Sequence, residues 1–289
     1  MPRFSFVTLD VFTDTRFGGN PLAVFPDARG MSDADMQALA AEFNLSETTF
    51  VLPPADPANT ARVRIFNRRA EMPFAGHPNV GTGWVLAQQG RAKNGKLRFE
   101  EIAGLVEIEV GDTITIAAPQ PLSLGPEMPV ELVAGCVGLK SGDVLTKAHR
   151  PVSASVGNSF VIAEVTGEAL TRATPDIGQF REAAKSYTAM GPNRLPLYLY
   201  AHDGARIRTR MFSPLSGTVE DPATGSAATP LAALLLSLSP AAVGTYDIVQ
   251  GVEMGRPSRL SCSAYRATDG IRAKVGGGCV PVLEGTVEL

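Results

Sequence analysis

The stretch Ala75-Gly76-His77-Pro78-Asn79-Val80-Gly81-Thr82-Gly83-Trp84 decides how the rest of the chain is interpreted. It has the pattern of a glycine turn, then a proline at a first helical position, then an apolar helix. Proline suits that position because its missing N–H would be unpaired there anyway. The small residues Gly81 and Gly83 predict that the helix packs closely against neighbouring strands. The free N–H groups and positive dipole end of such a helix start predict an anion site.

A second copy of this design occurs about half a chain later. The residues Asp221-Pro222-Ala223-Thr224-Gly225-Ser226 open another helix of small and apolar residues. A strand-like segment precedes each copy, residues 62–66 in the first and 208–212 in the second, at an offset of 146 residues. We therefore expect two similar lobes whose helix starts face a shared cleft.

The length of 289 residues fits two domains better than one core. The proline-rich stretch 119–129 is the best linker, which gives a first lobe at 1–125 and a second at 126–289. The sequence leaves open whether the last strand returns to the first lobe. Many short strands with one central helix per lobe predict an α+β fold in which each helix is wrapped by its own sheet.

The local patterns predict several elements around these two helices. Ser32 and Asp35 form a capping box for a helix that ends at Asn44, and β-branched residues at 48–52 predict a strand. A helix is expected at 180–187. The remaining expected strands lie at residues 4–12, 22–25, 96–100, 105–110, 113–117, 159–165, 197–201, 246–249, 258–262, 270–275 and 284–289.

Composition narrows the class of partner. The net charge is −3, and no run of five like charges occurs, so neither nucleic acid nor an anionic membrane surface is an expected partner. A small molecule is expected instead. The longest apolar run, residues 231–238, is far shorter than the roughly 20 residues that span a bilayer. The N-terminus lacks the apolar run of a signal peptide, which favours a cytoplasmic protein.

The histidines and cysteines argue against a metal site or a disulfide framework. No two of the three histidines, His77, His149 and His202, have ligand spacing. The three cysteines are widely spaced and include no C-x-x-C pair, which is typical of a reducing compartment. We expect no metal and no cofactor.

Four side chains are candidates for chemistry. His77 stands at a helix start, where a functional role competes with that of an ordinary loop residue. Glu47 precedes a buried strand and is either a solvated carboxylate or a general base tuned by burial. Asp221 is either a helix N-cap or a polar group that faces the cleft. Ser226 lacks the G-x-S-x-G pattern of a nucleophile and is interpreted as a hydrogen-bond donor.

Seven motifs in chain order resemble those of one protein family. They are Asp10-Val11-Phe12, Gly19-Asn20-Pro21, Asn44-Leu45-Ser46-Glu47-Thr48, Pro73-Phe74-Ala75-Gly76-His77-Pro78, Glu220-Asp221-Pro222-Ala223-Thr224-Gly225-Ser226-Ala227, Gln250-Gly251 and Met254-Gly255-Arg256-Pro257-Ser258. Over essentially the whole chain, the sequence resembles the phenazine-biosynthesis isomerases (PhzF-like), which share the diaminopimelate epimerase fold.

The resemblance implies two pseudo-symmetric lobes, each a β-barrel-like sheet around a central helix, with the active site between them. It also implies a homodimer and a proton shuttled by the glutamate that matches Glu47. The positions that match His77, Asp221 and Ser226 complete that site. The best-known member isomerises trans-2,3-dihydro-3-hydroxyanthranilate by moving hydrogen from C3 to C1 without a cofactor.

Two departures from relatives bear on the substrate. The cysteine pair of diaminopimelate epimerases is absent, since His77 and Thr224-Gly225 occupy the signature turns, which disfavours racemisation by two thiols. Arg68 and Arg69 stand where many relatives carry a Thr-Pro turn. These arginines either select an anionic substrate or are solvated.

The combined hypothesis is a cofactor-independent isomerase that acts on a small anionic metabolite, with Glu47 as acid and base. His77 and Asp221 would bind or polarise the substrate. Further contacts to the substrate are expected from Asn20, Ser46, Gly76, Gly225 and Ser226. One alternative is a one-base amino-acid epimerase or racemase that uses the same residues. The other is a small-acid-binding protein that has kept the fold and lost turnover.

Overall fold

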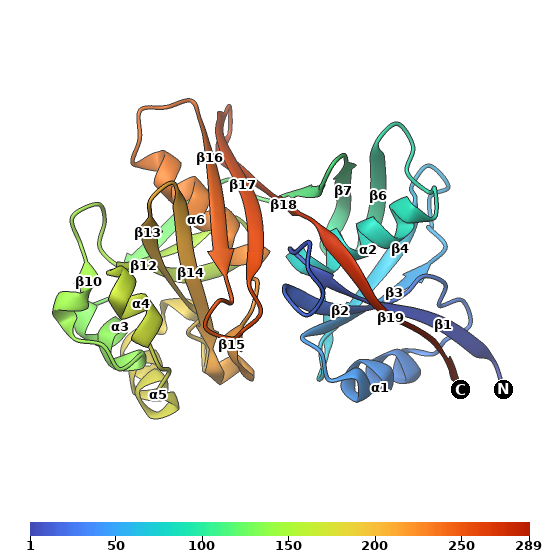
Figure 1. Cartoon of the computed structure of the whole chain (residues 1–289), viewed down its shortest axis with the longest axis horizontal. Helices are drawn as coiled ribbons and strands as arrows, with labels where there is room; N and C mark the ends of the chain where they lie inside the picture. Colours follow the sequence, from blue (N-terminus) through green and yellow to red (C-terminus); the bar gives the residue numbers. More distant parts are fainter. The chain divides into compact units, whose positions relative to one another are not determined.

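The computed structural model describes residues 1–289 and divides into two compact units. Unit 1 comprises Met1–Ala117 and Gly276–Leu289, and unit 2 comprises Ala118–Val275. The division therefore falls earlier than the boundary at 125/126 that the proline-rich stretch indicates. Strand β19 (Cys279–Glu288) pairs antiparallel with β1 (Arg3–Val11) along its whole length (Figure 1), which places the C-terminal strand in unit 1.

Unit 1 is a curled sheet wrapped around one helix. Besides β1 and β19, its elements are β2 (Asn20–Phe25), α1 (Asp33–Phe43), β3 (Glu47–Leu52), β4 (Ala61–Phe66), β5 (Glu71–Met72), α2 (Gly76–Gln88), β6 (Lys96–Glu101), β7 (Gly104–Val110) and β8 (Ile114–Ala117). Neighbouring strands pair in the order β19-β1-β2-β3-β4-β6-β7-β8, with β2–β3 and β4–β6 parallel and β5 added beside β4. Helix α2 contacts β1 and β2 as well as β7 and β8, so the sheet curls around it.

The glycines of α2 explain how closely that sheet can approach. A Cβ atom built at Gly81 would lie 2.6 Å from Leu22 Cδ2 and 2.8 Å from Val11 Cγ2, and one at Gly83 would lie 2.9 Å from Ile108 Cγ2. These distances are well inside van der Waals contact, so only glycine leaves room for the strands. The close packing expected from the sequence is confirmed.

Helix α1 covers the other face of the unit 1 sheet. Ser32 caps its start through the predicted capping box with Asp35, and Asn44 ends it in the left-handed conformation with φ of 53°. Its buried face, with Met36 and Leu39, packs on the aromatic cluster of Phe25 and its neighbours Phe4, Phe50 and Phe66. Both predicted ends of this helix are confirmed.

Unit 2 repeats the plan with a larger helical layer. Its elements are β9 (Ser123–Glu127), α3 (Val130–Cys136), β10 (Val144–Leu145), β11 (Val152–Ser155), β12 (Ser159–Val165), α4 (Gly167–Arg172), α5 (Ile177–Ser186), β13 (Leu197–Asp203), β14 (Arg206–Ser213), β15 (Thr218–Asp221), α6 (Gly225–Ser237), β16 (Val243–Gln250), β17 (Ser258–Ala267) and β18 (Gly270–Gly277), which crosses the boundary. Short 3₁₀ turns occur at Ser141–Asp143, Thr188–Met190 and Pro214–Ser216.

The strand pairings of unit 2 match those of unit 1 one by one. Strands β11 and β12 are antiparallel, β12 and β13 parallel, β13 and β14 antiparallel, β14 and β16 parallel, and β16 and β17 antiparallel. Helix α6 contacts β11 and β12 as well as β16 and β17, as α2 does in its own unit. The α+β fold with a central helix in each lobe is confirmed.

Several local expectations differ from the structure. Helix α2 begins at Gly76, so Pro78 is its third residue rather than its first, where its missing N–H still leaves no intrahelical bond unmade. The predicted linker contains β9, which pairs with β11. Helices α3 and α4 were not expected, because they are short and, with α5, owe their stability to packing on β12 and β13 (Figure 1).

Candidate active site

The parallel pairing of β2 and β3 brings two predicted site residues to one edge of the unit 1 sheet. Asn20 is the first residue of β2 and Glu47 the first of β3, with Leu22 opposite Glu47 in the register. Parallel strands begin at the same edge, so both side chains lie near the start of their strands. His77, the second residue of α2, reaches the same place from the helix.

His77 is the residue that contacts the other two. Its Nδ1 lies 3.4 Å from Glu47 Oε2 and 3.5 Å from Asn20 Nδ2. The side chain of His77 is 6 % exposed and that of Glu47 is 16 % exposed, while Asn20 is fully buried. Glu47 is therefore the group of the three that is open to an incoming molecule.

Burial keeps the His77 ring uncharged. Removal from water lowers the pKa of His77 to about 3, and the hydrogen bond to the Pro21 backbone opposes only part of that shift. The contact with Glu47 is therefore between a neutral imidazole and a carboxyl group, and it is not an ion pair at neutral pH. A neutral ring has one N–H, so Nδ1 donates to Glu47 only in the tautomer that makes Nε2 an acceptor. That Nε2 is buried without a hydrogen-bond partner.

The start of α2 has no side-chain cap. Ala75 is its extended N-cap residue and offers no acceptor to the first-turn N–H groups. Asn79 supports the turn instead, with its Nδ2 donating to the Ala75 carbonyl over 3.1 Å. Gly76 is buried and Ser46 is half-buried beside Glu47. A helix start without a cap has free N–H groups, which favours an anion there.

Asp221 of unit 2 is not the N-cap that the sequence suggested as its ordinary role. Helix α6 begins at Gly225, with Thr224 as the N-cap residue. Asp221 is the last residue of β15, is buried, and accepts a short hydrogen bond at Oδ2 from Thr224 Oγ1. Strand β15 pairs with β14 and ends at Asp221, so three residues lie between this strand and α6.

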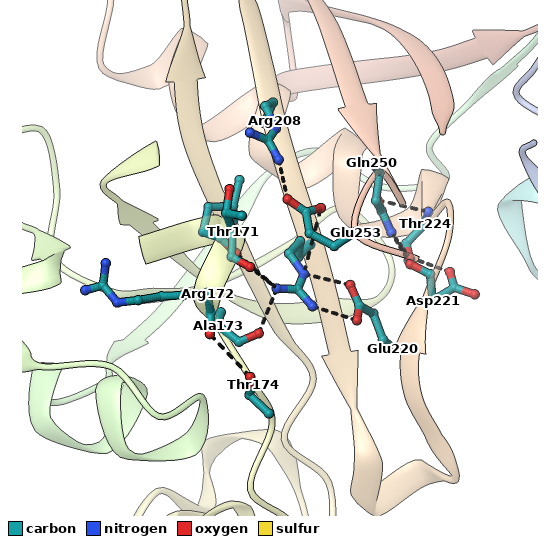
Figure 2. A network of polar contacts seen from close by, with 12 residues as sticks. Thr171, Arg172, Ala173, Thr174, Arg208, Glu220, Asp221, Thr224, Gln250 and Glu253 are labelled. Carbon is teal, nitrogen blue, oxygen red and sulfur yellow. Dashed lines mark hydrogen bonds and ion pairs between the residues drawn. The ribbon is translucent and has the colours of Figure 1, made fainter. Parts of the chain in front are cut away.

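Gln250, at the end of β16, holds this loop. Its Nε2 donates to the Asp221 carbonyl over 2.7 Å and to Thr224 Oγ1 over 3.0 Å (Figure 2). Its Oε1 accepts from the Thr224 backbone N–H over 3.2 Å and from the Tyr198 hydroxyl over 3.1 Å. All four hydrogen-bonding positions of the amide are used, which fixes its orientation. Gly225 is buried and Ser226 half-buried at the helix start that follows.

A buried ion network stands next to the Asp221 loop. Arg210 donates two parallel hydrogen bonds to Glu220, over 2.7 and 2.8 Å, and its Nη1 donates to the Ala173 carbonyl over 2.7 Å and the Leu170 carbonyl over 3.0 Å (Figure 2). Arg208 pairs with Glu253, just beyond Gln250. The network fixes the hairpin of β14 and β15 that ends at Asp221.

Arg68 and Arg69 form the exposed tip of the turn between β4 and β5. Asn67 Oδ1 accepts hydrogen bonds from the backbone N–H of Arg69 and of Ala70, which shapes that turn. Arg68 Nη1 lies 3.4 Å from Asn44 Oδ1, next to the strand that begins at Glu47. Because Thr48 is opposite Phe66 in the register, the turn begins beside Glu47.

The sequence did not identify the supporting residues Asn79, Arg210 and Gln250 as part of the site. Gln250 belongs to a motif of the family resemblance, and Arg210 repeats Arg64 at the offset of 146 residues, so both carried a signal. No three His, Cys, Asp or Glu side chains are grouped so as to hold a metal ion. None of the helices combines the length and the apolar character that a bilayer crossing requires.

Comparison with known proteins identifies the family. The sequence profile of the phenazine biosynthesis-like proteins, PhzC-PhzF, matches residues 9–285. The chain belongs to the PhzC-PhzF family. It is 37 % identical to an uncharacterised isomerase of Mesorhizobium japonicum, with 99 % of both chains covered. It is 36 % identical to the trans-2,3-dihydro-3-hydroxyanthranilate isomerase of Pseudomonas chlororaphis, with 98 % of this chain and 99 % of that one covered.

A solved structure of the PhzF family has the same fold. The crystal structure of the Bacillus anthracis PhzF-family protein superimposes with a TM-score of 0.90 at 25 % identity and covers 100 % of both chains. The resemblance to PhzF-like isomerases is thereby confirmed, as is the epimerase-like fold. The enzyme class is confirmed at the level of an isomerase of the PhzF family, since its relatives carry that name.

Proposed function

We propose that this PhzF-family protein is a cofactor-independent isomerase that moves a proton between two carbons of a small carboxylated metabolite, with Glu47 as both acid and base. The observation that supports it best is the contact between Glu47 and the neutral, buried His77. The named relatives support the reaction type, because one of them isomerises trans-2,3-dihydro-3-hydroxyanthranilate.

Glu47 suits a reaction in which one group takes a proton and gives it back. The carboxylate removes a proton from a C–H bond, the electron pair of that bond enters the conjugated system, and the same proton is returned to another carbon. Glu47 ends the cycle ionised, as it began. The neutral ring of His77 orients the carboxylate without neutralising it, because a ring with a pKa of about 3 carries no charge near neutral pH.

The other predicted residues would bind the substrate and the charge that develops on it. Gly76 and Gly225 offer backbone N–H groups at the starts of α2 and α6, which suit a carboxylate. Ser226 and Asp221 are proposed to hydrogen-bond polar groups of the same molecule, and Asn20 and Ser46 to support the position of Glu47. The exposed Arg68 and Arg69, in the turn that begins beside Glu47, are proposed to favour a small anion. A homodimer is proposed on the family resemblance and is tested by sedimentation velocity.

The decisive experiment follows label and absorbance together. The protein is incubated with trans-2,3-dihydro-3-hydroxyanthranilate in deuterated water, and ultraviolet absorbance and deuterium at each ring carbon are recorded. We expect turnover by the parent and a loss of at least about 10³-fold in Glu47→Gln, because the amide cannot accept the proton. Glu42→Gln, an exposed carboxylate on α1, is the matched control and should behave as the parent.

Three results would contradict the proposal. Full turnover in Glu47→Gln would remove Glu47 from the chemistry. Inversion of a chiral amino acid without any change in absorbance would instead identify an epimerase or racemase. Tight binding of the substrate with neither a change in absorbance nor isotope exchange would identify a binding protein that lacks turnover.

A further inference from the structure

Three buried oxygen atoms near the start of α2 have no hydrogen-bond partner of normal geometry. They are Oε1 and Oε2 of Glu101, the last residue of β6, and Oδ1 of Asn79, in the first turns of α2. Asn79 is fully buried. Buried acceptors without a donor are destabilising, so a structure that keeps three of them near one another calls for a physical explanation.

The orientation of Asn79 is set by the helix itself. Its Nδ2 donates to the Ala75 carbonyl over 3.1 Å, and rotating the amide by half a turn would bring Oδ1 against that carbonyl oxygen instead. Asn79 Oδ1 is therefore fixed as an acceptor. The Asn79 amide also interacts with the carboxyl group of Glu101, and this interaction lowers the pKa of Glu101.

Glu101 reaches the region of Asn79 from the turn between β6 and β7. Glu101 is paired with Gly104 in the tight turn between β6 and β7. Within that turn, the Ala103 N–H donates to the Pro73 carbonyl over 3.1 Å, three residues before Gly76. This hydrogen bond joins the turn between β6 and β7 to the segment that leads into α2. Glu101 stands at the start of that turn, and Asn79 belongs to the helix that follows the segment.

No charged group is available to pair with Glu101. The adjacent carboxylate of Glu100 accepts hydrogen bonds from the backbone N–H groups of Ala55 and Asp56, and faces the other way. On β7, Glu107 pairs with Lys96 and Arg98 near the far end of β6. On α2 the titratable group is His77, which burial keeps neutral.

One proton on a carboxyl oxygen of Glu101 gives two of these three oxygens a hydrogen bond, because that oxygen can then donate to Asn79 Oδ1. We propose that Glu101 is a neutral carboxylic acid whose O–H donates to Asn79 Oδ1, and that this hydrogen bond positions the first turn of α2 with Gly76 and His77. Glu101 would then be a positioning residue that does not touch the substrate. The effect of Glu101 on turnover rests on the proposed function. Its protonation state and its hydrogen bond to Asn79 do not depend on that function.

Burial supports the neutral state. It raises the pKa of Glu101 from the ordinary 4.5 to about 8, with the Asn79 amide opposing part of the shift. Between pH 4.5 and 8 the folded protein therefore binds more protons at this site than the unfolded chain. Stability from this group is highest below pH 4.5 and falls as the pH rises towards 8.

The first experiment observes the proton without using activity. The protein is labelled with ¹³C at the glutamate carboxyl groups, and the Glu101 resonance is assigned as the one lost in Glu101→Gln. We expect this resonance to report a neutral carboxylic acid at pH 6.5 and to titrate near pH 8. An ionised Glu101 at pH 6.5 would overturn the proposal, whether the cause is water, a bound cation or motion of the turn.

The second experiment uses two matched variants to test whether Glu101 positions the first turn of α2. Glu101→Gln keeps a donor for Asn79 Oδ1 at every pH, whereas Glu101→Leu removes it. We expect the ¹⁵N shifts of the His77 ring and the Asn79 amide to match those of the parent at pH 6.5 in Glu101→Gln and to move in Glu101→Leu. These ¹⁵N shifts should change as the pH passes 8 in the parent and in neither variant. Glu107→Gln, on exposed β7, is the control.

Thermal unfolding and turnover complete the test. The melting temperature of the parent should fall relative to that of Glu101→Gln between pH 4.5 and 8, and the two should run parallel above pH 9. If the substrate is turned over, the loss of kcat above pH 8 should be absent from Glu101→Gln. An identical pH dependence of His77 shifts and melting in the parent and Glu101→Gln would refute the proposal even where turnover itself is confirmed.

Discussion

In unit 2 every buried side-chain nitrogen and oxygen has a hydrogen-bond partner, whereas in unit 1 His77 Nε2, Asn79 Oδ1 and the Glu101 oxygens have none. The two loops that lead into α2 and α6 follow the same path through the same strand order. The hydrogen bonding of their buried polar groups nevertheless differs. Unit 2 fixes its loop with a saturated amide. Unit 1 keeps ionisable groups buried and unsatisfied, and burial lowers the pKa of His77 and raises that of Glu101.

The scaffold under the two loops is closely repeated. Arg64 lies over the ring of Phe66 at 5.0 Å, and Arg210 lies over Phe212 at 4.9 Å. Each arginine also forms two parallel hydrogen bonds to the next hairpin strand, Arg64 to Glu71 and Arg210 to Glu220. The difference between the units therefore lies in side chains added to a common backbone, and it can be tested pair by pair.

The largest effect is expected from the two arginines. Arg210→Met should lower the free energy of unfolding by about 3–5 kcal/mol, because it leaves the largely buried Glu220 without its ion pair and the Leu170 and Ala173 carbonyls without their donor. Arg64→Met should cost only about 1–2 kcal/mol, since of its two partners Asp33 is 82 % exposed and Glu71 is 23 % exposed, so both can be solvated more easily than Glu220. Urea unfolding measures both. Equal losses would show that the two networks are equivalent and remove this difference between the units.

A smaller difference is expected from the two amides. Gln250→Leu should cost about 2–3 kcal/mol, because the Asp221 carbonyl, Thr224 and the Tyr198 hydroxyl all lose a partner. Asn79→Leu should cost less, about 1–2 kcal/mol, because only the Ala75 carbonyl and the proposed Glu101 O–H lose a partner. Thermal and urea unfolding at pH 6 compare them. A larger loss for Asn79→Leu than for Gln250→Leu would contradict this order.

The smallest effect is a pH dependence of unit 1. His77 has its pKa lowered to about 3 in the folded state, so the unfolded chain binds more protons between pH 6.5 and 3. Stability from the neutral ring is complete above pH 6.5 and is lost as the pH falls. Relative to His77→Gln, the parent should lose about 1–2 kcal/mol between pH 6.5 and 5. His202→Gln, exposed on unit 2, is the control, and a flat difference for His77→Gln would contradict the burial of the ring.

Much of the fold follows from local patterns. The capping box at Ser32, the left-handed end at Asn44 and the strand alternation were predicted because they depend on neighbours within a few residues. The close approach at Gly81 was predicted because a missing Cβ has only one common use in an apolar helix. The strand within the proline-rich linker was not predicted, because β9 is exposed and exists through its pairing with β11.

The candidate site was predicted unevenly for the same reason. Glu47, His77 and Asn20 stand in motifs that mark a strand start or a helix start, and they meet because parallel strands begin at one edge of the sheet. The N-cap role considered for Asp221 was misplaced by three residues, because Thr224 is the N-cap residue of α6 and Gln250 shapes the loop from a distant strand.

The sequence by itself determined the duplicated α+β plan, the two central helices and the residue types gathered at their starts, because periodicity, glycine placement and repeated motifs are properties of short segments. Only the tertiary structure decided which polar groups are buried with partners and which without. That distinction depends on atoms contributed by strands and turns far apart in the chain, such as Glu101 behind Asn79 and Gln250 behind Asp221. Burial and hydrogen bonding set the charge of each group, and they exist only once those segments have packed.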